Sequence, residues 1–317
     1  MIQVRELTKK FGPKLAVDTL SFDVQPGRVT GFLGPNGAGK STTMRMIIGL
    51  DKPTSGSAIV NGKQYAEHDA PLCQVGALLE AKAVHTSRSA RNHLRALAAT
   101  HGIGNRRVEE MIELVGLDQV AGKKVGGFSL GMGQRLGIAA ALLGDPAVLV
   151  LDEPVNGLDP EGVRWVRELL KAKAAEGRTV FVSSHLMSEM AQTAEHIIVI
   201  GRGRLLADTP TEDLISSASA KVVAVRAPEA SRLAGALAGP DVTVISRSED
   251  SLEVHGLSSA EIGTIALASG VVLHELTPQQ ASLEEAFMEM TASTVEFHAA
   301  DIEAPAPAGH IERNPNQ

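Results

Sequence analysis

The residues with the clearest chemical purpose form a glycine-rich segment, GPNGAGKS, between a strand-like run at 28–33 and a helix-like run at 42–48. In a G-x-x-x-x-G-K-S segment, the glycines let backbone N–H groups converge on a phosphate. The lysine can bridge the β- and γ-phosphates, and the serine hydroxyl can ligate Mg²⁺. An ordinary glycine turn would not need this strand and helix, so a nucleoside triphosphate is the expected ligand. The expected binding residues are Gly34, Pro35, Asn36, Gly37, Ala38, Gly39, Lys40, Ser41 and Thr42.

Four further segments lie downstream, in an order that a generic phosphate-binding protein would not supply by accident. They are FSLGMGQR at 128–135, AVLVLDEP at 147–154, NGLD at 156–159 and VSSH at 182–185. Together they resemble the ATP-binding subunit of an ABC transporter, and the resemblance covers about residues 2–214. It implies a P-loop NTPase that binds ATP and Mg²⁺, hydrolyses the ATP and energises a separate membrane permease.

The resemblance assigns roles to polar residues at the ends of the strands. Asp152 would hold Mg²⁺, Glu153 would act as general base toward the attacking water, and His185 would contact the γ-phosphate. Ser41 and Glu80 would be further metal ligands, with Glu80 at a place where most members carry glutamine. On the residues alone, the two acids could face solvent and a lone histidine could be structural. A buried strand, however, needs a reason to end in adjacent like charges.

The first downstream segment resembles a degenerate form of the family's LSGGQ signature. Ser129 and Gly131 are in position, whereas Leu130 and Met132 replace a glycine and a glutamine. Both Ser129 and Gly131 are expected at the nucleotide, because a serine hydroxyl and a helix N-terminus suit a γ-phosphate. The resemblance also implies that Asp159 helps to set geometry across a dimer interface. Ser129 and Asp159 could alternatively be plain caps of the helices that follow them.

Two other features rest on the same resemblance. Phe11 lies where the family places an aromatic ring that stacks on adenine, although it could equally be a core residue. Glu80 in place of glutamine is similar to ATPase subunits of bacterial peptide-antibiotic and lantibiotic self-protection exporters. The SLEEAF segment at 282–287 is similar to their C-terminal segment. These features favour export over import.

The chain has one phosphate-binding loop, one signature and no internal repeat, so a full transporter needs two copies. The resemblance implies a head-to-tail homodimer, in which the signature of one copy closes over ATP held by the other. Lys40, Mg²⁺ and the helix end at Ser129 would stabilise the charge on the γ-phosphoryl group during in-line attack by water. The surface around Glu80 and the helical insert would pass opening and closing on to the permease.

The apolar pattern predicts the elements that position these groups. Strands are expected at 2–7, 20–24, 28–33, 147–151, 179–182 and 197–200. Asn61-Gly62 predicts a hairpin after 58–60, and helical spacing extends from about 89 to 143. This pattern predicts an α/β fold, with a RecA-like P-loop NTPase core, an antiparallel β-subdomain and a helical insert at about 84–143.

After about residue 216 the pattern changes. Strands are expected at 222–226, 242–246, 252–255 and 271–276, with helices from 229 and over 260–268. Strand-helix-strand occurs twice, which fits a ferredoxin-like unit. The predicted organisation is an ABC ATP-binding domain at 1–216, a small C-terminal accessory α+β domain at 217–291 and a disordered tail at 292–317. A short amphipathic helix at 282–290 ends the second domain.

Composition excludes several classes of protein. The 317 residues are 44% apolar and 21% charged, as in soluble globular proteins. A net charge of −7 argues against an overall attraction to nucleic acid, and no such partner is expected. The single cysteine, Cys73, fits a reducing compartment. Neither a signal pattern nor an apolar run of membrane-spanning length occurs, so the predicted location is cytoplasmic, on the inner face of the cell membrane through the permease.

The main alternative is a soluble ABC ATPase that acts on the ribosome or DNA. Ribosome-associated members usually carry two ATP cassettes in one chain, and chromosome-maintenance members insert long coiled coils before the signature. This chain has neither feature. A GTPase or small-molecule kinase is a further alternative, but no N-K-x-D guanine motif occurs. A nucleotide sensor without turnover would not need Glu153 at the position of a base.

Overall fold

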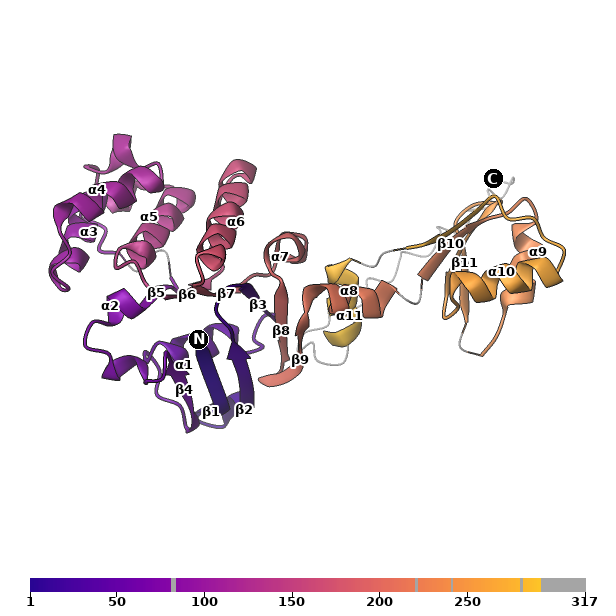
Figure 1. Ribbon diagram of the computed structural model, residues 1–317, viewed down its shortest axis with the longest axis horizontal. Helices are drawn as coiled ribbons and strands as arrows, with labels where there is room; N and C mark the ends of the chain where they lie inside the picture. Colours follow the sequence, from indigo (N-terminus) through magenta and orange to yellow (C-terminus); the bar gives the residue numbers. More distant parts are fainter. Residues whose placement is uncertain (81–83, 220–221, 241, 280–281, 292–317) are drawn as a thin grey trace, which may run out of the picture.

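The computed structural model describes residues 1–80, 84–219, 222–240, 242–279 and 282–291. Within these residues the strands form three sheets, of six, three and four strands. The elements form the mixed α/β fold predicted from the sequence (Figure 1). The tail expected at 292–317 lies outside the described residues.

The six-stranded sheet lies at the centre of the larger, N-terminal part of the molecule. Its order is β5 (Val75–Leu78), β6 (Val148–Asp152), β7 (Thr179–Ser183), β3 (Val29–Leu33), β8 (His196–Gly201) and β9 (Arg204–Pro210). The first five strands are parallel, and β9 pairs antiparallel to β8 at the edge. Along β6, Leu149 and Leu151 join one hydrophobic core, while Val148 and Val150 join another. Both faces are therefore buried, as the prediction of a buried strand at 147–151 requires.

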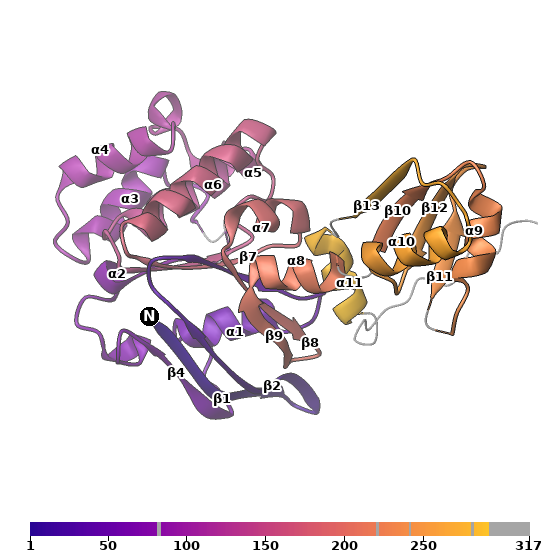
Figure 2. The ribbon, with the colours of Figure 1, turned by 45° about the vertical axis from the view of Figure 1, so that its right-hand side comes forward.

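Helices cover one face of this sheet (Figures 1 and 2). They are α2 (Pro71–Gln74), α3 (Ala90–Ala99), α4 (Asn105–Leu114), α5 (Leu130–Leu142), α6 (Pro160–Ala175) and α7 (Met187–Thr193), with 3₁₀ turns at Asp118–Val120 and Val125–Gly127. Gly102 and Gly116 follow α3 and α4 with φ of +65° and +66°. Such left-handed residues end helices at little cost when they are glycine, so glycine suits both positions.

An antiparallel sheet and one helix cover the other face. These elements are β1 (Ile2–Phe11), β2 (Lys14–Val24), β4 (Ser55–Val60) and α1 (Lys40–Ile47). Phe22, Phe32 and Phe181 join the two sheets, with ring centroids 5.0–5.7 Å apart. The hairpin predicted at Asn61-Gly62 is wrong in part: the turn forms, but only the bridge between Val60 and Lys63 follows it. A 3₁₀ turn, Tyr65–Glu67, with its own capping box replaces the second strand.

The C-terminal unit follows α8 (Thr211–Ser219) and lies at one end of the long axis in Figure 1. Its elements are β10 (Val222–Arg226), α9 (Ala230–Leu237), β11 (Thr243–Ser246), β12 (Ser251–His255), α10 (Ser259–Ala268) and β13 (Glu275–Pro278). The antiparallel order β11-β12-β10-β13 confirms the predicted succession of strand-helix-strand units. The last strand was predicted too early. The Val271 N–H donates to Ala266 O and so closes α10, which leaves no strand there.

The last described helix, α11 (Leu283–Thr291), leaves the C-terminal unit and packs against α7 and α8 (Figure 2). Leu283, Ala286 and Phe287 are buried in the same hydrophobic core as α5 and α6. Because β10 to β13 lie between α8 and α11 in the chain, that unit is connected to the N-terminal part at both of its ends.

We expect Phe287→Ala to lower the free energy of unfolding by about 3 kcal/mol, because it removes a buried ring from the contact of α11 with α7 and α8. Phe287 is 7% exposed, whereas its neighbour Met288 is 61% exposed and provides a matched control. Met288→Ala should change stability by less than about 0.5 kcal/mol. Denaturant unfolding followed by circular dichroism measures both variants. Equal effects of the two substitutions would show that α11 does not pack as described.

Candidate functional site

The carboxyl end of β3 leads through the glycine-rich loop into α1. Gly39 is the residue before α1 and has φ +102°, a conformation that suits glycine alone. A Cβ on Gly39 would lie 2.5 Å from Ala16 O, so a larger residue would also meet the backbone of β2. The loop therefore has the local structure that sequence reasoning predicts for a phosphate cradle.

A cleft of about 420 Å³ opens over this loop. Its lining brings together most of the predicted loop residues with both adjacent carboxylates. The lining residues are Phe11, Lys14, Ala16, Asn36, Gly37, Ala38, Gly39, Lys40, Ser41, Thr42, Asp152 and Glu153. Its volume is within the range of small-molecule sites. Gly34 and Pro35 do not line the cleft, and their carbonyl oxygens instead accept hydrogen bonds from Lys40.

Lys40 is the cationic centre of the cleft. Its Nζ donates to Gly34 O at 2.5 Å and to Pro35 O at 3.3 Å. Burial lowers the pKa of Lys40, although the negative charges of Glu153 and Asp152 oppose that shift. A triphosphate would offer this ammonium group stronger acceptors than the two carbonyls, because its oxygens are charged.

The carboxylates at the end of β6 meet the end of β7. Ser183 Oγ donates a hydrogen bond to Asp152 Oδ1 and accepts one from the Glu153 N–H at 3.0 Å. The Glu153 Oε2 lies 2.6 Å from His185 Nδ1, and the His185 N–H points to the same oxygen at 3.4 Å. The structure thus brings the predicted base and the predicted histidine into direct contact.

Ser129 and Asp159 lie outside this cleft within one chain. Ser129 Oγ accepts from the Met132 N–H at 3.2 Å and caps α5. Asp159 Oδ1 accepts from the Gly162 N–H at 2.9 Å and caps α6. Both capping roles are present, and the roles of Ser129, Gly131 and Asp159 toward a partner's nucleotide stay predictions.

Phe11 and Glu80 differ in their relation to the cleft. Phe11 is 50% exposed at its rim, with Lys9 Nζ 4.9 Å from the ring centroid, so it is not a core residue. Glu80 lines a neighbouring cleft of about 290 Å³ together with Arg45 and His93. In this conformation Glu80 does not line the nucleotide cleft, so its role as a metal ligand stays a prediction.

Comparison with known proteins places this geometry in a family. The sequence profile described as ABC transporter matches residues 17–156, and a profile for a domain of unknown function matches residues 221–284. The chain is 42% identical over 217 residues to the bacitracin transport ATP-binding protein of Bacillus licheniformis, covering 68% of this chain and 71% of that protein. The chain belongs to the ATP-binding proteins of ABC transporters.

Other relatives of this ABC protein agree with the assignment. A lantibiotic transport ATP-binding protein of Streptococcus pyogenes is 35% identical over 206 residues, with 65% of this chain and 89% of that protein covered. An uncharacterised ABC transporter ATP-binding protein of Bacillus subtilis (strain 168) is 33% identical over 299 residues, covering 92% and 96%. The solved structure of an ATP-binding subunit of an ABC transporter superposes with a TM-score of 0.63 at 27% identity, covering 68% and 92%.

Two contacts in this ABC protein escaped sequence reasoning. Gln134 Nε2 donates a hydrogen bond to Glu153 O at 2.8 Å. The only sign of this contact in the sequence was a glutamine within the mainly apolar segment that forms α5. Leu130, in place of a signature glycine, packs against Gly157. A Cβ on Gly157 would lie 2.3 Å from Leu130 Cδ2, so the larger side chain in the signature is accommodated by a glycine in the NGLD segment.

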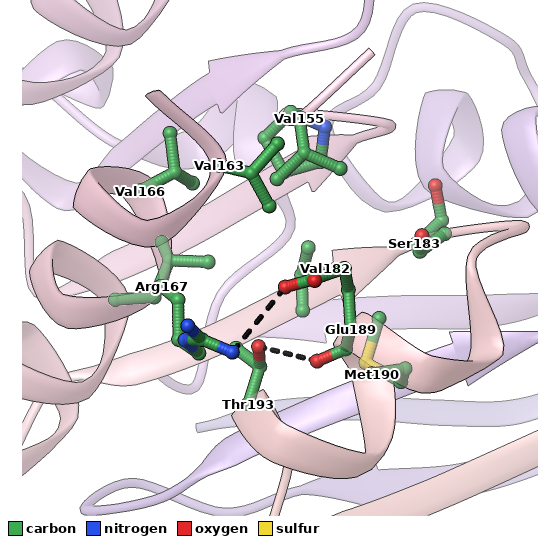
Figure 3. A pocket seen from close by; sticks show the side chains of 12 residues that line it. Val155, Val163, Val166, Arg167, Val182, Ser183, Glu189, Met190 and Thr193 are labelled. Carbon is green, nitrogen blue, oxygen red and sulfur yellow. Dashed lines mark hydrogen bonds and ion pairs between the residues drawn. The ribbon is translucent and has the colours of Figure 1, made fainter. Parts of the chain in front are cut away.

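A further, mainly apolar cavity lies between α6 and α7, near the carboxyl ends of β6 and β7 (Figure 3). Val155, Val163 and Val182 line it. Its polar groups pair with one another: Arg167 Nη1 lies 3.4 Å from Glu189 Oε2, and Thr193 Oγ1 donates to Glu189 O at 2.6 Å. These groups are therefore already engaged with one another.

The stability of this ABC protein should depend on pH through His93. Burial, and secondarily the charge of Arg88, lower the pKa of His93 below its ordinary value of about 6.5. The unfolded chain then binds the proton more readily, so stability is full above about pH 6.5 and falls as pH drops toward the folded pKa. His93→Gln should flatten this dependence in denaturant unfolding between about pH 7.5 and 5. His85→Gln, at an exposed histidine, is the control, and an unchanged slope in His93→Gln would contradict the expectation.

Proposed function

We propose that the chain is the Mg²⁺-dependent ATPase of an exporter for a peptide antibiotic or a related drug. The main support for the proposal is a cleft in which the phosphate-binding loop faces Asp152 and Glu153. The Glu153 Oε2 atom in turn lies 2.6 Å from His185 Nδ1. The relatives named for bacitracin and lantibiotic transport support the class of substrate.

The residues of the cleft fit a nucleotide with Mg²⁺. Ser41 and Asp152 provide hard oxygen donors, which Mg²⁺ prefers. In the described part of the chain, no cluster of three or more His, Cys, Asp or Glu residues is arranged to hold a metal. That agrees with a magnesium ion that takes its remaining ligands from phosphate and water. Glu80 is a third proposed ligand, and its ligation requires a rearrangement when nucleotide binds.

The chain's own residues would perform the reaction as follows. Lys40 and the loop N–H groups hold the phosphates, and Phe11 stacks on the adenine. Bound Mg²⁺ would offset the charge on the β- and γ-phosphate oxygens. Glu153 accepts a proton from the attacking water, and His185 orients this carboxylate and contacts the γ-phosphate. The loop and the helix dipoles stabilise the charge that develops in the transition state.

We further propose that two copies act together. Ser129 and Gly131 of one copy would close over the nucleotide in the other, and Asp159 would set the geometry between the copies. A solved dimeric cassette of a bacterial ABC transporter, 25% identical with a TM-score of 0.61 over 67% of this chain and 99% of that one, supports this assembly. Because residues of both copies would contact each ATP, the nucleotide would hold the two copies together.

The proposed partner in the membrane is a separate permease. In the described residues, every helix is too short or too polar to cross a lipid bilayer. We propose that the chain lies in the cytoplasm, on the inner face of the membrane, where the permease contacts the cleft around Glu80 and the helical insert. We also propose residues 1–216 as the ATP-binding domain and 217–291 as the accessory domain, whose last helix, α11, packs back on α7 of the ATP-binding domain. We expect no nucleic-acid partner.

Expression with the permease encoded beside this chain tests the proposal. Cells that carry both proteins should tolerate more bacitracin or lantibiotic than cells that carry the permease with the Glu153→Gln chain. The chain should also co-purify with that permease from detergent extracts. Recovery of ribosomes or DNA instead, without a membrane partner, would favour the alternative of a non-transport ATPase.

A further inference from the structure

The backbone of Glu153 is held in a conformation that the residue rarely adopts. Its φ is +51°, in the left-handed region that suits glycine. Pro154 follows, and a residue before proline is normally confined to extended conformations. Such a conformation persists where surrounding contacts impose it. The contacts at Glu153 therefore determine where its carboxylate lies.

Four residues hold Glu153. The Ser183 hydroxyl accepts from its N–H at 3.0 Å, and His185 Nδ1 contacts its carboxylate at 2.6 Å. Its carbonyl oxygen accepts from the Asn156 N–H at 3.2 Å and from Gln134 Nε2 at 2.8 Å. Three of these residues lie at the end of β7 or in the segments that follow β6 and β7. Gln134 alone comes from α5.

We propose that Gln134 is a positioning residue for the catalytic base, an inference that rests on the proposed role of Glu153. Gln134 is 4% exposed, and its amide donates a hydrogen bond to the carbonyl oxygen of the residue that has this unusual backbone conformation. A carbonyl oxygen only accepts hydrogen bonds, so the contact requires a donor on the side chain at position 134. An apolar side chain of equal length would fill the same space without holding the carbonyl.

The position of Gln134 on α5 gives this contact a second consequence. Ser129 caps α5, and Gln134 lies five residues further along, about 7.5 Å along the axis. In the proposed dimer, the N-terminus of α5 contacts the nucleotide of the partner. A rigid helix would then move Gln134 and the carbonyl of Glu153 when that nucleotide is bound or released. Gln134 would thus link the occupancy of one composite site to the base of the other.

Two isosteric variants test the role of the donor. Gln134→Met should lower kcat for ATP about five- to tenfold with little change in KM, the effect of one lost hydrogen bond. Its melting temperature is measured in parallel, because a purely structural residue would lower stability and leave kcat per folded molecule unchanged. Gln134→Glu should exceed Gln134→Met in activity at acidic pH, where a protonated carboxyl can donate to the carbonyl. Gln74→Met makes the same exchange on α2, outside the cleft, and should behave as wild type.

The outcomes separate this inference from the proposed function. A kcat for Gln134→Met within about twofold of wild type, or equal activity of the Met and Glu variants at every pH, would overturn the role of Gln134. If Glu153→Gln is inactive in the same assays, the role of Glu153 as base stands even when the role of Gln134 is overturned. If Glu153→Gln turns over like wild type, both the base assignment and the inference about Gln134 fall.

Discussion

Glu153→Gln should lower the ATP turnover of the purified chain about a thousandfold and leave nucleotide binding intact. The amide keeps the size of the carboxylate and can still contact His185 Nδ1, which lies 2.6 Å from the present carboxylate. It cannot, however, accept a proton from the attacking water. Binding should survive because the phosphates are held by the loop and Lys40, on the other side of the cleft.

The same variant should accumulate as an ATP-bound dimer, since hydrolysis is the step that would release the two copies. Phosphate release measures turnover, and size-exclusion chromatography with ATP measures the dimer. Glu168→Gln, at an exposed position of α6, makes the same chemical change away from the cleft and should match wild type. If the turnover of Glu153→Gln lay within threefold of wild type, Glu153 would not be the general base.

Lys40→Ala should weaken ATP binding about 30- to 150-fold, which corresponds to roughly 2–3 kcal/mol. Lys40 Nζ is buried with two backbone carbonyls as acceptors, and a triphosphate would replace them with charged oxygens. Charge-assisted hydrogen bonds of this kind are about twice as strong as neutral ones. The loss should therefore appear in binding itself as well as in turnover.

Isothermal titration with a non-hydrolysable ATP analogue measures this effect. Lys14→Ala is a suitable control because Lys14 also lines the cleft but is exposed, so solvent screens its charge. It should weaken binding less than about fivefold. Equal losses for the two lysines would indicate general electrostatic attraction and would contradict a specific site at Lys40.

Much of the fold follows from the sequence where one local rule dominates. Uninterrupted apolar runs predict β6, β7 and β8 because those strands are buried on both faces. Two other strands escaped prediction. Strand β5 is four residues long and contains Gly76, whose missing Cβ admits the backbone of α5. Strand β9 is a half-exposed edge with a mixed sequence, placed by the turn at Arg202 and Gly203.

The candidate site could likewise be predicted only in part. The loop, the carboxylates and the histidine could be predicted because each lies at the end of a strand, where parallel strands converge. Contacts between distant segments could not. Leu130 and Gly157 lie in two separate segments of the sequence, and only the folded chain shows that the glycine provides space for the leucine. The contact of Gln134 is likewise with the Glu153 carbonyl, 19 residues away in the sequence, and only the folded chain brings the two together.

Mixing two inactive variants tests the composite site most directly. Lys40→Ala weakens the phosphate site and Ser129→Arg blocks the signature. At an ATP concentration well below the Kd of the Lys40→Ala chain, neither homodimer should therefore show appreciable hydrolysis. In a mixed dimer, one site carries both defects and the other carries none. Equal mixing should therefore restore about a quarter of wild-type turnover, because about half of the dimers are mixed and each keeps one of two sites. No recovery, with mixed dimers demonstrated by differential tags, would contradict the account.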